Sequence, residues 1–171
     1  LVNGAKGIGT GFSTDIMCYN PEQIIHYIEG LLEGLGETEQ KLRIIEPYYR
    51  GFKGKIIPLD ESRKKYLIKG VYELYGKDQI LVTELPIGTW TQDYKEFLES
   101  LLSNGKDRDK DKDKKQKECY IKDYTDMSTD TNVEFIITFY PGAMNKLLAE
   151  KHDYGLEGIE KYLRLYTSQS T

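Results

Sequence analysis

Apolar residues recur at helical spacing over residues 21–35. Asn20 is suited to cap this segment, Pro21 favours a first helical turn, and Gln23 can complete a capping box. The apolar positions are Ile24, Ile25, Ile28, Leu31, Leu32 and Leu35. Their separation by three or four residues predicts a helix with an apolar face, and Gly34 can end it.

Three apolar runs separated by turn-forming residues follow the helix. They are GKIIPL, KYLIKGVYEL and QILVTEL, within residues 54–85. Each is rich in β-branched or aromatic residues, so we expect three strands joined as an antiparallel meander. The run TWTQDYKEFLESLL then predicts a second helix, because Thr89 and Gln92 have the spacing of a capping box.

The last part of the chain mixes a strand with short helices. NVEFIITFY predicts a strand at residues 132–140, and GAMNKLLAEK and GLEGIEKYL predict short helical segments after it. The chain ends in RLYTSQST, which is typical of a hydroxyl-rich strand edge. Because helices and strands mix without βαβ alternation, the fold class is α+β, an antiparallel sheet with packed helices.

A charged tract, GKDRDKDKDKKQKE, occupies residues 105–118 and contains no apolar residue. Such a segment cannot bury enough surface to offset its ordering entropy, so we expect a disordered insertion. An electrostatic role on DNA stays open, although the alternating charges largely cancel. We therefore expect residues 20–104 and 119–171 to form two parts of one domain, preceded by a glycine-rich loop at 1–19.

Composition narrows the function classes. The chain has 171 residues and a net charge of −4, so any contact with nucleic acid must come from a local basic patch. Two distant cysteines, Cys18 and Cys119, suggest neither a disulfide framework nor a metal cluster, which fits a reducing compartment. No apolar run is long enough for a membrane span, and the initial Leu1 suggests part of a longer protein.

The glycine-rich stretch NGAKGIGTGFST surrounds one bulky residue, Ile8, with four glycines. It does not fit the phosphate-binding loop pattern, and Phe12 stands where a dinucleotide-binding loop needs glycine. Two interpretations stay open. The stretch is either a tight structural turn with Ile8 in the core, or a thin support from which Ile8 enters a DNA base step.

Four blocks decide between these interpretations by resemblance. The blocks are LVNGAKGIGTGFST, VTELPIGTWTQDYKEFL, STDTNVEFIITF and LRLYTSQST. They resemble, in order and approximate spacing, LVNGAEGIGTGWST, TELPVRTWTQTYKE, HTDTTVKFVV and FKLQTSLT of eukaryotic and large-DNA-virus type IIA DNA topoisomerases. The resemblance implies the tower, or shoulder, of the DNA-cleavage core, with residues 1–19 joining an upstream winged-helix domain.

The resemblance also implies a set of DNA contacts. Ile8 matches the isoleucine that enters the gate duplex and bends it. The full set of implied DNA-binding residues is Lys6, Ile8, Trp90, Arg164, Thr167, Ser168, Gln169 and Ser170. Two plainer interpretations stay open: Trp90 packed on the sheet, and residues 164–170 as an ordinary solvent-facing strand edge.

For the parent protein, the resemblance implies a homodimeric, ATP- and Mg²⁺-dependent DNA topoisomerase acting on double-stranded DNA. The family's nucleophilic tyrosine directly follows an arginine, and this sequence contains no Arg-Tyr pair. We therefore assign no catalytic residue, metal ligand or cofactor to the chain, and expect it to be inactive alone. An intracellular location is implied, either the nucleus or, for a virus, the host cytoplasm or viral factory. A DNA-bending architectural domain and a protein-interaction scaffold stay open as alternatives.

Overall fold

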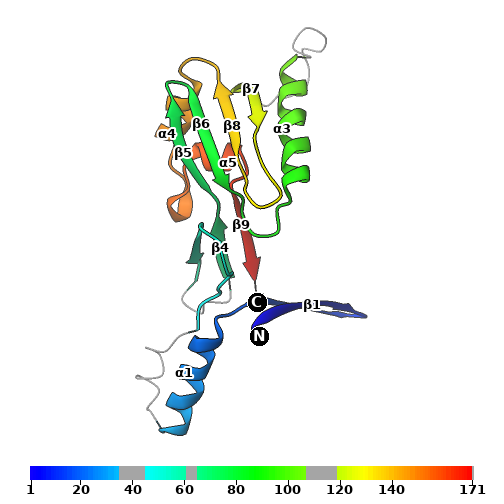
Figure 1. The fold of residues 1–171 in the computed structure, drawn as a ribbon, viewed down its shortest axis with the longest axis vertical. Helices are drawn as coiled ribbons and strands as arrows, with labels where there is room; N and C mark the ends of the chain where they lie inside the picture. The colour runs from blue at the N-terminus through cyan, green and yellow to red at the C-terminus, as the bar shows by residue number, and fades with distance from the viewer. Residues whose placement is uncertain (35–44, 61–64, 107–118, 171) are drawn as a thin grey trace.

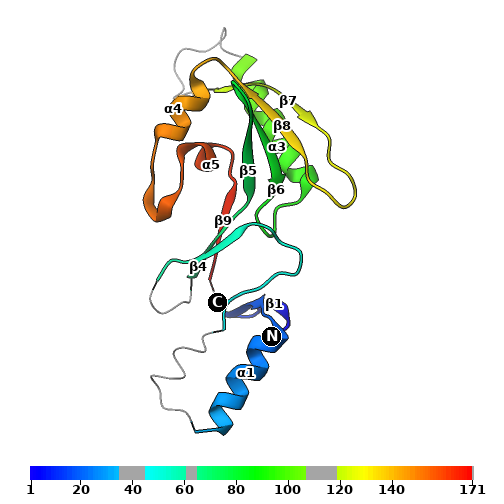
Figure 2. The same ribbon diagram turned by 60° about the vertical axis from the view of Figure 1, so that its left-hand side comes forward.

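A computed structural model describes residues 1–34, 45–60, 65–106 and 119–170 of the chain (Figure 1). The molecule is elongated. A four-stranded sheet with its helices forms one end, a three-stranded sheet forms the middle, and a hairpin with the first helix forms the other end (Figures 1 and 2). Both chain termini lie beside the hairpin.

The first helix, α1 (Pro21–Leu32), begins as the sequence predicts. The Asn20 side chain accepts a hydrogen bond from the Glu22 amide at 2.9 Å. Gln23 does not close a capping box on this cap, because its amide oxygen accepts from the Glu46 amide at 3.3 Å. The apolar face is confirmed as a pattern, but much of it is open to solvent among the described residues. Its exposed members are Ile25, Ile28, Leu31 and Leu32.

The predicted three-strand meander is wrong, because its middle run divides between two sheets. The strands in this region are β3 (Lys55–Pro58), β4 (Lys65–Lys69), β5 (Val71–Gly76) and β6 (Gln79–Glu84). β4 lies between β3 and β9 (Tyr166–Ser170), whereas β5 begins the separate order β5-β6-β8-β7. Gly70 joins the two sheets. A side chain there would put its Cβ 2.4 Å from the Glu84 carbonyl oxygen.

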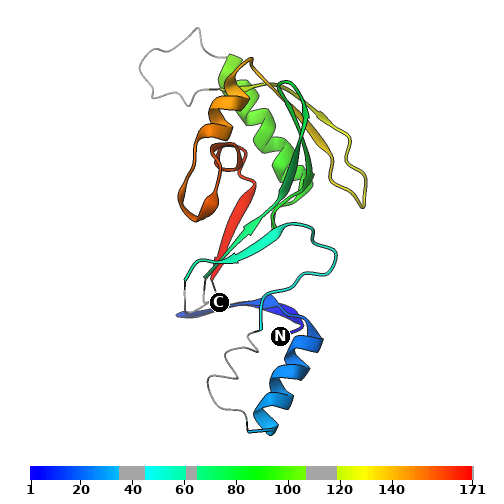
Figure 3. The same ribbon diagram turned by 90° about the vertical axis from the view of Figure 1, so that its left-hand side faces the viewer.

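We call the four-stranded sheet the helix-backed sheet. It is completed by β7 (Ile121–Asp126) and β8 (Phe135–Phe139), and its helices are α3 (Thr91–Lys106), α4 (Ala143–Ala149) and α5 (Gly158–Tyr162). Figure 3 shows these helices on one side of the strands. In β8 the residues Phe135, Ile137 and Phe139 are buried and alternate with half-buried ones, and they share one core with all three helices. This is the pattern of an antiparallel sheet packed on one face.

The start of α3 differs slightly from the prediction. The Thr89 amide donates to the Pro86 carbonyl at 3.0 Å, and Gly88 has a φ of 88°, so residues 86–89 form a turn that requires glycine at its third position. α3 therefore begins at Thr91 rather than directly after Thr89. It continues to Lys106, two residues into the tract expected to be disordered, and the rest of that tract lies outside the described residues.

Residues 1–19, expected to be a loop, are largely a β-hairpin. Strands β1 (Asn3–Gly9) and β2 (Phe12–Cys18) pair antiparallel, and Gly11 takes the left-handed conformation at the turn with a φ of 86°. We call residues 3–18 the glycine hairpin. Glycine content favours irregular structure, yet the two segments pair in one register from end to end.

Candidate nucleic-acid interface

The glycine hairpin projects sideways from the long axis of the molecule (Figure 1). Every residue from 5 to 14 is exposed, and Ile8 is 87% exposed. The interpretation of Ile8 as a core residue is therefore wrong. A two-stranded ribbon that buries no apolar face is marginally stable by itself, so the fold alone gives no reason for an isoleucine at this position.

The register of the glycine hairpin assigns its side chains to two faces. Lys6 pairs with Asp15 and Ile8 pairs with Ser13, with no shift along the ladder. Because side chains alternate along a strand, these four share one face, and Phe12 lies on the other. Phe12 is 86% exposed, so the tip carries an apolar side chain on each face.

Glycine is required at some positions of the hairpin and not at others. Gly4 has a φ of 63°, and a Cβ there would lie 2.6 Å from the Ile16 carbonyl oxygen. At Gly7 a Cβ would meet nothing within 4 Å. Gly4 is therefore needed by the fold, whereas Gly7 leaves the ribbon thin at a place where another molecule could approach closely.

The base of the glycine hairpin is fixed to two other segments. The Tyr48 amide donates to the Cys18 carbonyl at 2.8 Å, and Met17 is buried. On the other side, Gln169 donates from Nε2 to Asp15 Oδ1 at 2.9 Å. Its Oε1 accepts from the Tyr49 hydroxyl at 3.3 Å. The exposed tip thus extends from a fastened base.

Strand β9 carries four of the predicted contacts and connects two of the predicted regions. Ser168 and Ser170 are exposed and pair with Leu67 and Lys65 of β4. The Thr167 hydroxyl donates to the carbonyl of Ile87, in the turn before Trp90, at 3.4 Å. β9 therefore extends from the Trp90 turn, at Thr167, to the base of the glycine hairpin, at Gln169.

Trp90 is 76% exposed, so the interpretation that packs it on the sheet is wrong. It directly precedes α3, and its carbonyl accepts from the Tyr94 amide at 3.0 Å. The neighbouring Thr89 lines a hollow of about 570 Å³, which Trp90 itself does not line. Its lining residues include Thr89, Asp93, Phe97, Arg164, Tyr166 and Ser168. Hydroxyls and one guanidinium suit phosphate oxygens, while Asp93 adds a single opposing charge.

Arg164 is held in an unusual backbone conformation with a φ of 52°. The Arg164 amide donates to the Lys161 carbonyl at 3.4 Å, and the Leu165 amide donates to the Glu160 carbonyl at 2.9 Å. These two bonds form the Schellman motif that ends α5, at a position that glycine usually occupies. The Arg164 guanidinium lies 4.5 Å from the centre of the Phe97 ring, so its charge is presented from a fixed support.

The described residues carry little that resembles a catalytic centre. They include no group of three or more His, Cys, Asp or Glu side chains that could hold a metal ion, and no helix that could cross a membrane. Cys18 and Cys119, both within the described ranges, are not joined in a disulfide. Burial raises the pKa of Tyr49 and of Tyr94, the opposite of what activates a tyrosine nucleophile.

Comparison with known proteins places this arrangement in a family. The family model that describes the A subunits of DNA gyrase and topoisomerase IV matches residues 1–168. The chain belongs to the type IIA DNA topoisomerase family. Two similar relatives are both named DNA topoisomerase 2. That of Bombyx mori is 38% identical over 99% of this chain and 9% of its own length. That of Acanthamoeba polyphaga mimivirus is 31% identical over 94% of this chain and 16% of its own length.

A solved topoisomerase has the same fold. It is the Plasmodium falciparum topoisomerase II DNA-binding, cleavage and re-ligation domain, with a TM-score of 0.80 and 34% identity over 100% of this chain and 20% of that one. The α+β class, antiparallel sheets with packed helices, is therefore confirmed. The chain spans about a tenth to a sixth of the length of these relatives.

Two residues of the candidate interface were missed from the sequence. Asp15 and Tyr49 both bind Gln169, but they lie 154 and 120 residues from it in the chain. No local signal marks them, because an aspartate in a hairpin and a tyrosine in a Tyr-rich chain are ordinary. The roles on DNA of the predicted contact residues remain predictions: Lys6, Ile8, Trp90, Arg164, Thr167, Ser168, Gln169 and Ser170.

Proposed function

We propose that this chain is the DNA-bending part, the tower, of an ATP- and Mg²⁺-dependent type II DNA topoisomerase. Ile8 enters a base step of the gate duplex, and strand β9 holds the flanking backbone. The single observation that supports this role best is the exposure of Ile8, 87%, at the tip of a projecting hairpin. A second apolar side chain and thin glycine positions beside it fit insertion between bases.

We call the inserted Ile8 side chain the wedge. The free energy gained by burying it is too small to offset the cost of unstacking and bending the duplex. Unstacking a base step costs a few kcal/mol, and bending a site of 20–30 base pairs costs about 1–6 kcal/mol. Fully burying an isoleucine side chain returns only about 1.5–3 kcal/mol. The remainder has to come from contacts that a straight duplex could not make at the same time as the wedge.

The proposed additional contacts are those that the structure aligns along β9 and the Trp90 turn. Lys6 lies on the face of Ile8. Thr167, Ser168 and Ser170 lie on β9, and Arg164 precedes that strand at the end of α5. Guanidinium, ammonium and hydroxyl groups bind phosphate oxygens without reading sequence, which suits an enzyme that acts on many DNA sites. The exposed Trp90 ring adds a flat surface beside them.

Cleavage itself is assigned to other parts of the parent polypeptide. We propose that the tyrosine nucleophile, the Mg²⁺ site and the ATPase lie outside this chain, in a homodimer that cuts, passes and reseals double-stranded DNA. The chain alone should then bend or bind DNA without cleaving it. An intracellular location also remains a prediction.

The test is Ile8→Ala in the complete polypeptide that contains these residues, with end-labelled duplex DNA and fluorescence energy transfer as the measure of bending. We expect the bent fraction of bound DNA to fall about tenfold, since most of the wedge is removed. The matched control is Phe12→Ala, which removes an equally exposed side chain from the opposite face and should have a smaller effect. Undiminished bending by Ile8→Ala would refute the wedge. A parent polypeptide that bends DNA but never cleaves it would favour the architectural alternative.

A further inference from the structure

Gln169 differs from the other predicted DNA contacts in the described chain, because its side-chain amide bonds protein groups at both ends. We propose that Gln169 is a positioning residue that fixes the glycine hairpin against β9, so that Ile8 meets DNA at a set angle. The inference rests on the proposed function and deepens it. It assigns to Gln169 a role in bending rather than in phosphate binding.

The chemistry of the three groups fixes their arrangement. A carboxylate can only accept, so Asp15 selects the Nε2 end of the amide at 2.9 Å. The Tyr49 hydroxyl then donates to Oε1 at 3.3 Å. Burial raises the pKa of Tyr49, so its hydroxyl keeps its proton at neutral pH. Gln169 is half-buried, which leaves the amide few competing water molecules.

The hydrogen bond between Gln169 and Asp15 acts at the part of the glycine hairpin that sets the direction of Ile8. Asp15 lies on the same face of the glycine hairpin as Ile8, two positions along the ladder. Two residues of a strand span about 7 Å, so a small rotation at Asp15 displaces the Ile8 side chain. Beyond this point, residues 7–14 are exposed and have no packed surface to correct their direction.

The same strand holds the opposite end of the proposed interface. Thr167, two residues before Gln169, bonds the carbonyl of Ile87 beside the Trp90 turn. β9 is itself fixed by its ladder with β4, in which Gln169 pairs with the buried Tyr66. Strand β9 thereby keeps Ile8 and the proposed phosphate-binding residues at a fixed distance from each other. A duplex that contacts both at once has to bend.

Three variants of the complete polypeptide test this role. Gln169→Leu keeps the size of the side chain and removes both hydrogen bonds. Gln169→Glu places a second carboxylate against Asp15. The exchange pair Asp15→Asn with Gln169→Glu restores an amide-to-carboxylate bond in the reverse direction. It keeps an oxygen on residue 169 that accepts from the Tyr49 hydroxyl, and it does not alter net charge. Gln79→Leu is the matched control, because Gln79 bonds Thr138 at 3.1 Å within the helix-backed sheet.

Bending and affinity are measured separately, by energy transfer at saturating protein and by titration over a range of salt. We expect Gln169→Leu to lower the bent fraction at least about fivefold, because it removes two hydrogen bonds that are each worth at least a factor of about two, and Gln169→Glu to lower it further. The affinity should change less than about twofold, with no change in its salt dependence. The exchange pair should recover bending to near the wild-type value, and Gln79→Leu should bend DNA normally.

Different results would overturn the positioning role of Gln169 and the proposed function. Unchanged bending by Gln169→Leu, or an exchange pair no better than Gln169→Glu, would overturn the positioning role. So would a loss of affinity with a salt slope reduced by about one, the signature of a direct phosphate contact. A wild-type protein that binds DNA without bending it would instead overturn the proposed function itself. Thermal unfolding of each variant shows whether the fold is intact.

Discussion

The helix-backed sheet and the glycine hairpin follow opposite rules in one chain. In the sheet, Phe135, Ile137 and the residues that α3, α4 and α5 turn toward them are buried in a common core. In the hairpin, Ile8 and Phe12 are among the most exposed apolar residues of the described chain. Packing accounts for the first region, because each large side chain there removes apolar area from water. Packing does not account for the second, for which we propose DNA as the partner.

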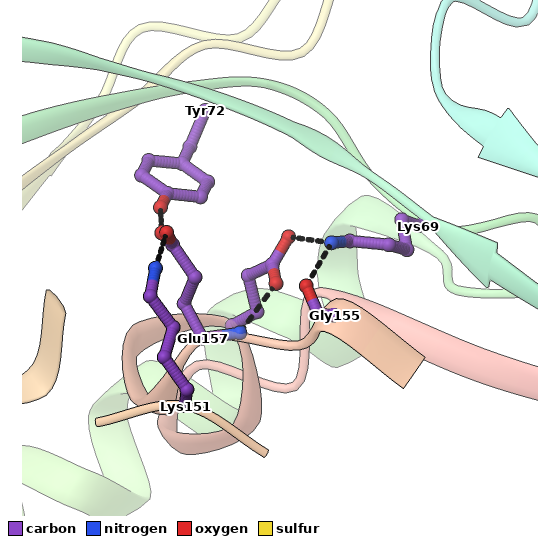
Figure 4. A network of polar contacts seen from close by, with 6 residues as sticks. Lys69, Tyr72, Lys151, Gly155 and Glu157 are labelled. Carbon is purple, nitrogen blue, oxygen red and sulfur yellow. Dashed lines mark hydrogen bonds and ion pairs between the residues drawn. The ribbon is translucent and has the colours of Figure 1, made fainter. Parts of the chain in front are cut away.

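A network of polar contacts joins the two sheets in the packed part of the molecule, away from the glycine hairpin. Lys69 of β4 forms an ion pair with Glu160 of α5 at 2.7 Å and donates to the Gly155 carbonyl at 3.2 Å. Close by, Glu157 accepts from both Tyr72 and Lys151 (Figure 4). The Lys69 bonds hold the three-stranded sheet against α5, and the Tyr72 bond holds β5 of the helix-backed sheet to the start of α5. We therefore expect both sets of bonds to affect stability and not DNA binding directly.

The largest expected effect is that of Lys69→Met. It removes the partner of Glu160, whose side chain is only 7% exposed, and a buried charge left without its partner costs about 3–5 kcal/mol. Urea unfolding of the chain measures this loss. The control is Lys95→Met, which breaks a more exposed pair with Asp126 and should cost at most about 1 kcal/mol. Equal losses from both variants would show that burial does not set the strength of the Lys69 pair.

A smaller effect is expected from two glycine substitutions that compare the base of the glycine hairpin with its exposed part. Gly4→Ala forces a left-handed alanine against the Ile16 carbonyl and should cost about 1–3 kcal/mol at the base, seen as faster hydrogen exchange of the Tyr48 amide. Gly7→Ala has open space and should change stability by less than about 0.5 kcal/mol. It should nevertheless weaken DNA binding. If Gly7→Ala binds DNA like the wild type, close approach at that position is not needed.

The smallest effect concerns acid stability. Hydrogen bonds from Lys151 and Tyr72 hold the pKa of Glu157 below its usual value, and burial offsets them only in part. The unfolded value is about 4.3, so this contribution is present above that pH and is lost as the pH falls through the lower folded pKa. Glu157→Gln should therefore flatten the fall of the urea midpoint between about pH 5 and pH 3. Glu73→Gln, on the exposed part of β5, is the matched control and should leave the curve unchanged.

Local patterns predicted elements well where one residue's neighbours decide its structure. Asn20 and Pro21 marked the start of α1, and the alternation in NVEFIITFY marked β8 with its buried face. The same patterns failed where the structure depends on a backbone segment that is far away in the sequence. The run KYLIKGVYEL has uniform strand character, and only the pairing of its two halves with different strands, on either side of Gly70, shows that it serves two sheets. The helical periodicity of α1 likewise could not show that Ile25 and Ile28 are exposed.

The features of the candidate site likewise divide into those that the sequence predicts and those that only the tertiary structure shows. The sequence by itself determined that an isoleucine stands among glycines in a segment with a topoisomerase pattern, because both are properties of adjacent residues. Only the tertiary structure decided that Ile8 projects into solvent, that Trp90 is not packed on the sheet, and that Gln169 meets Asp15. The contacts of Gln169 join residues more than a hundred positions apart, and their geometry depends on how the strands between them are paired and packed.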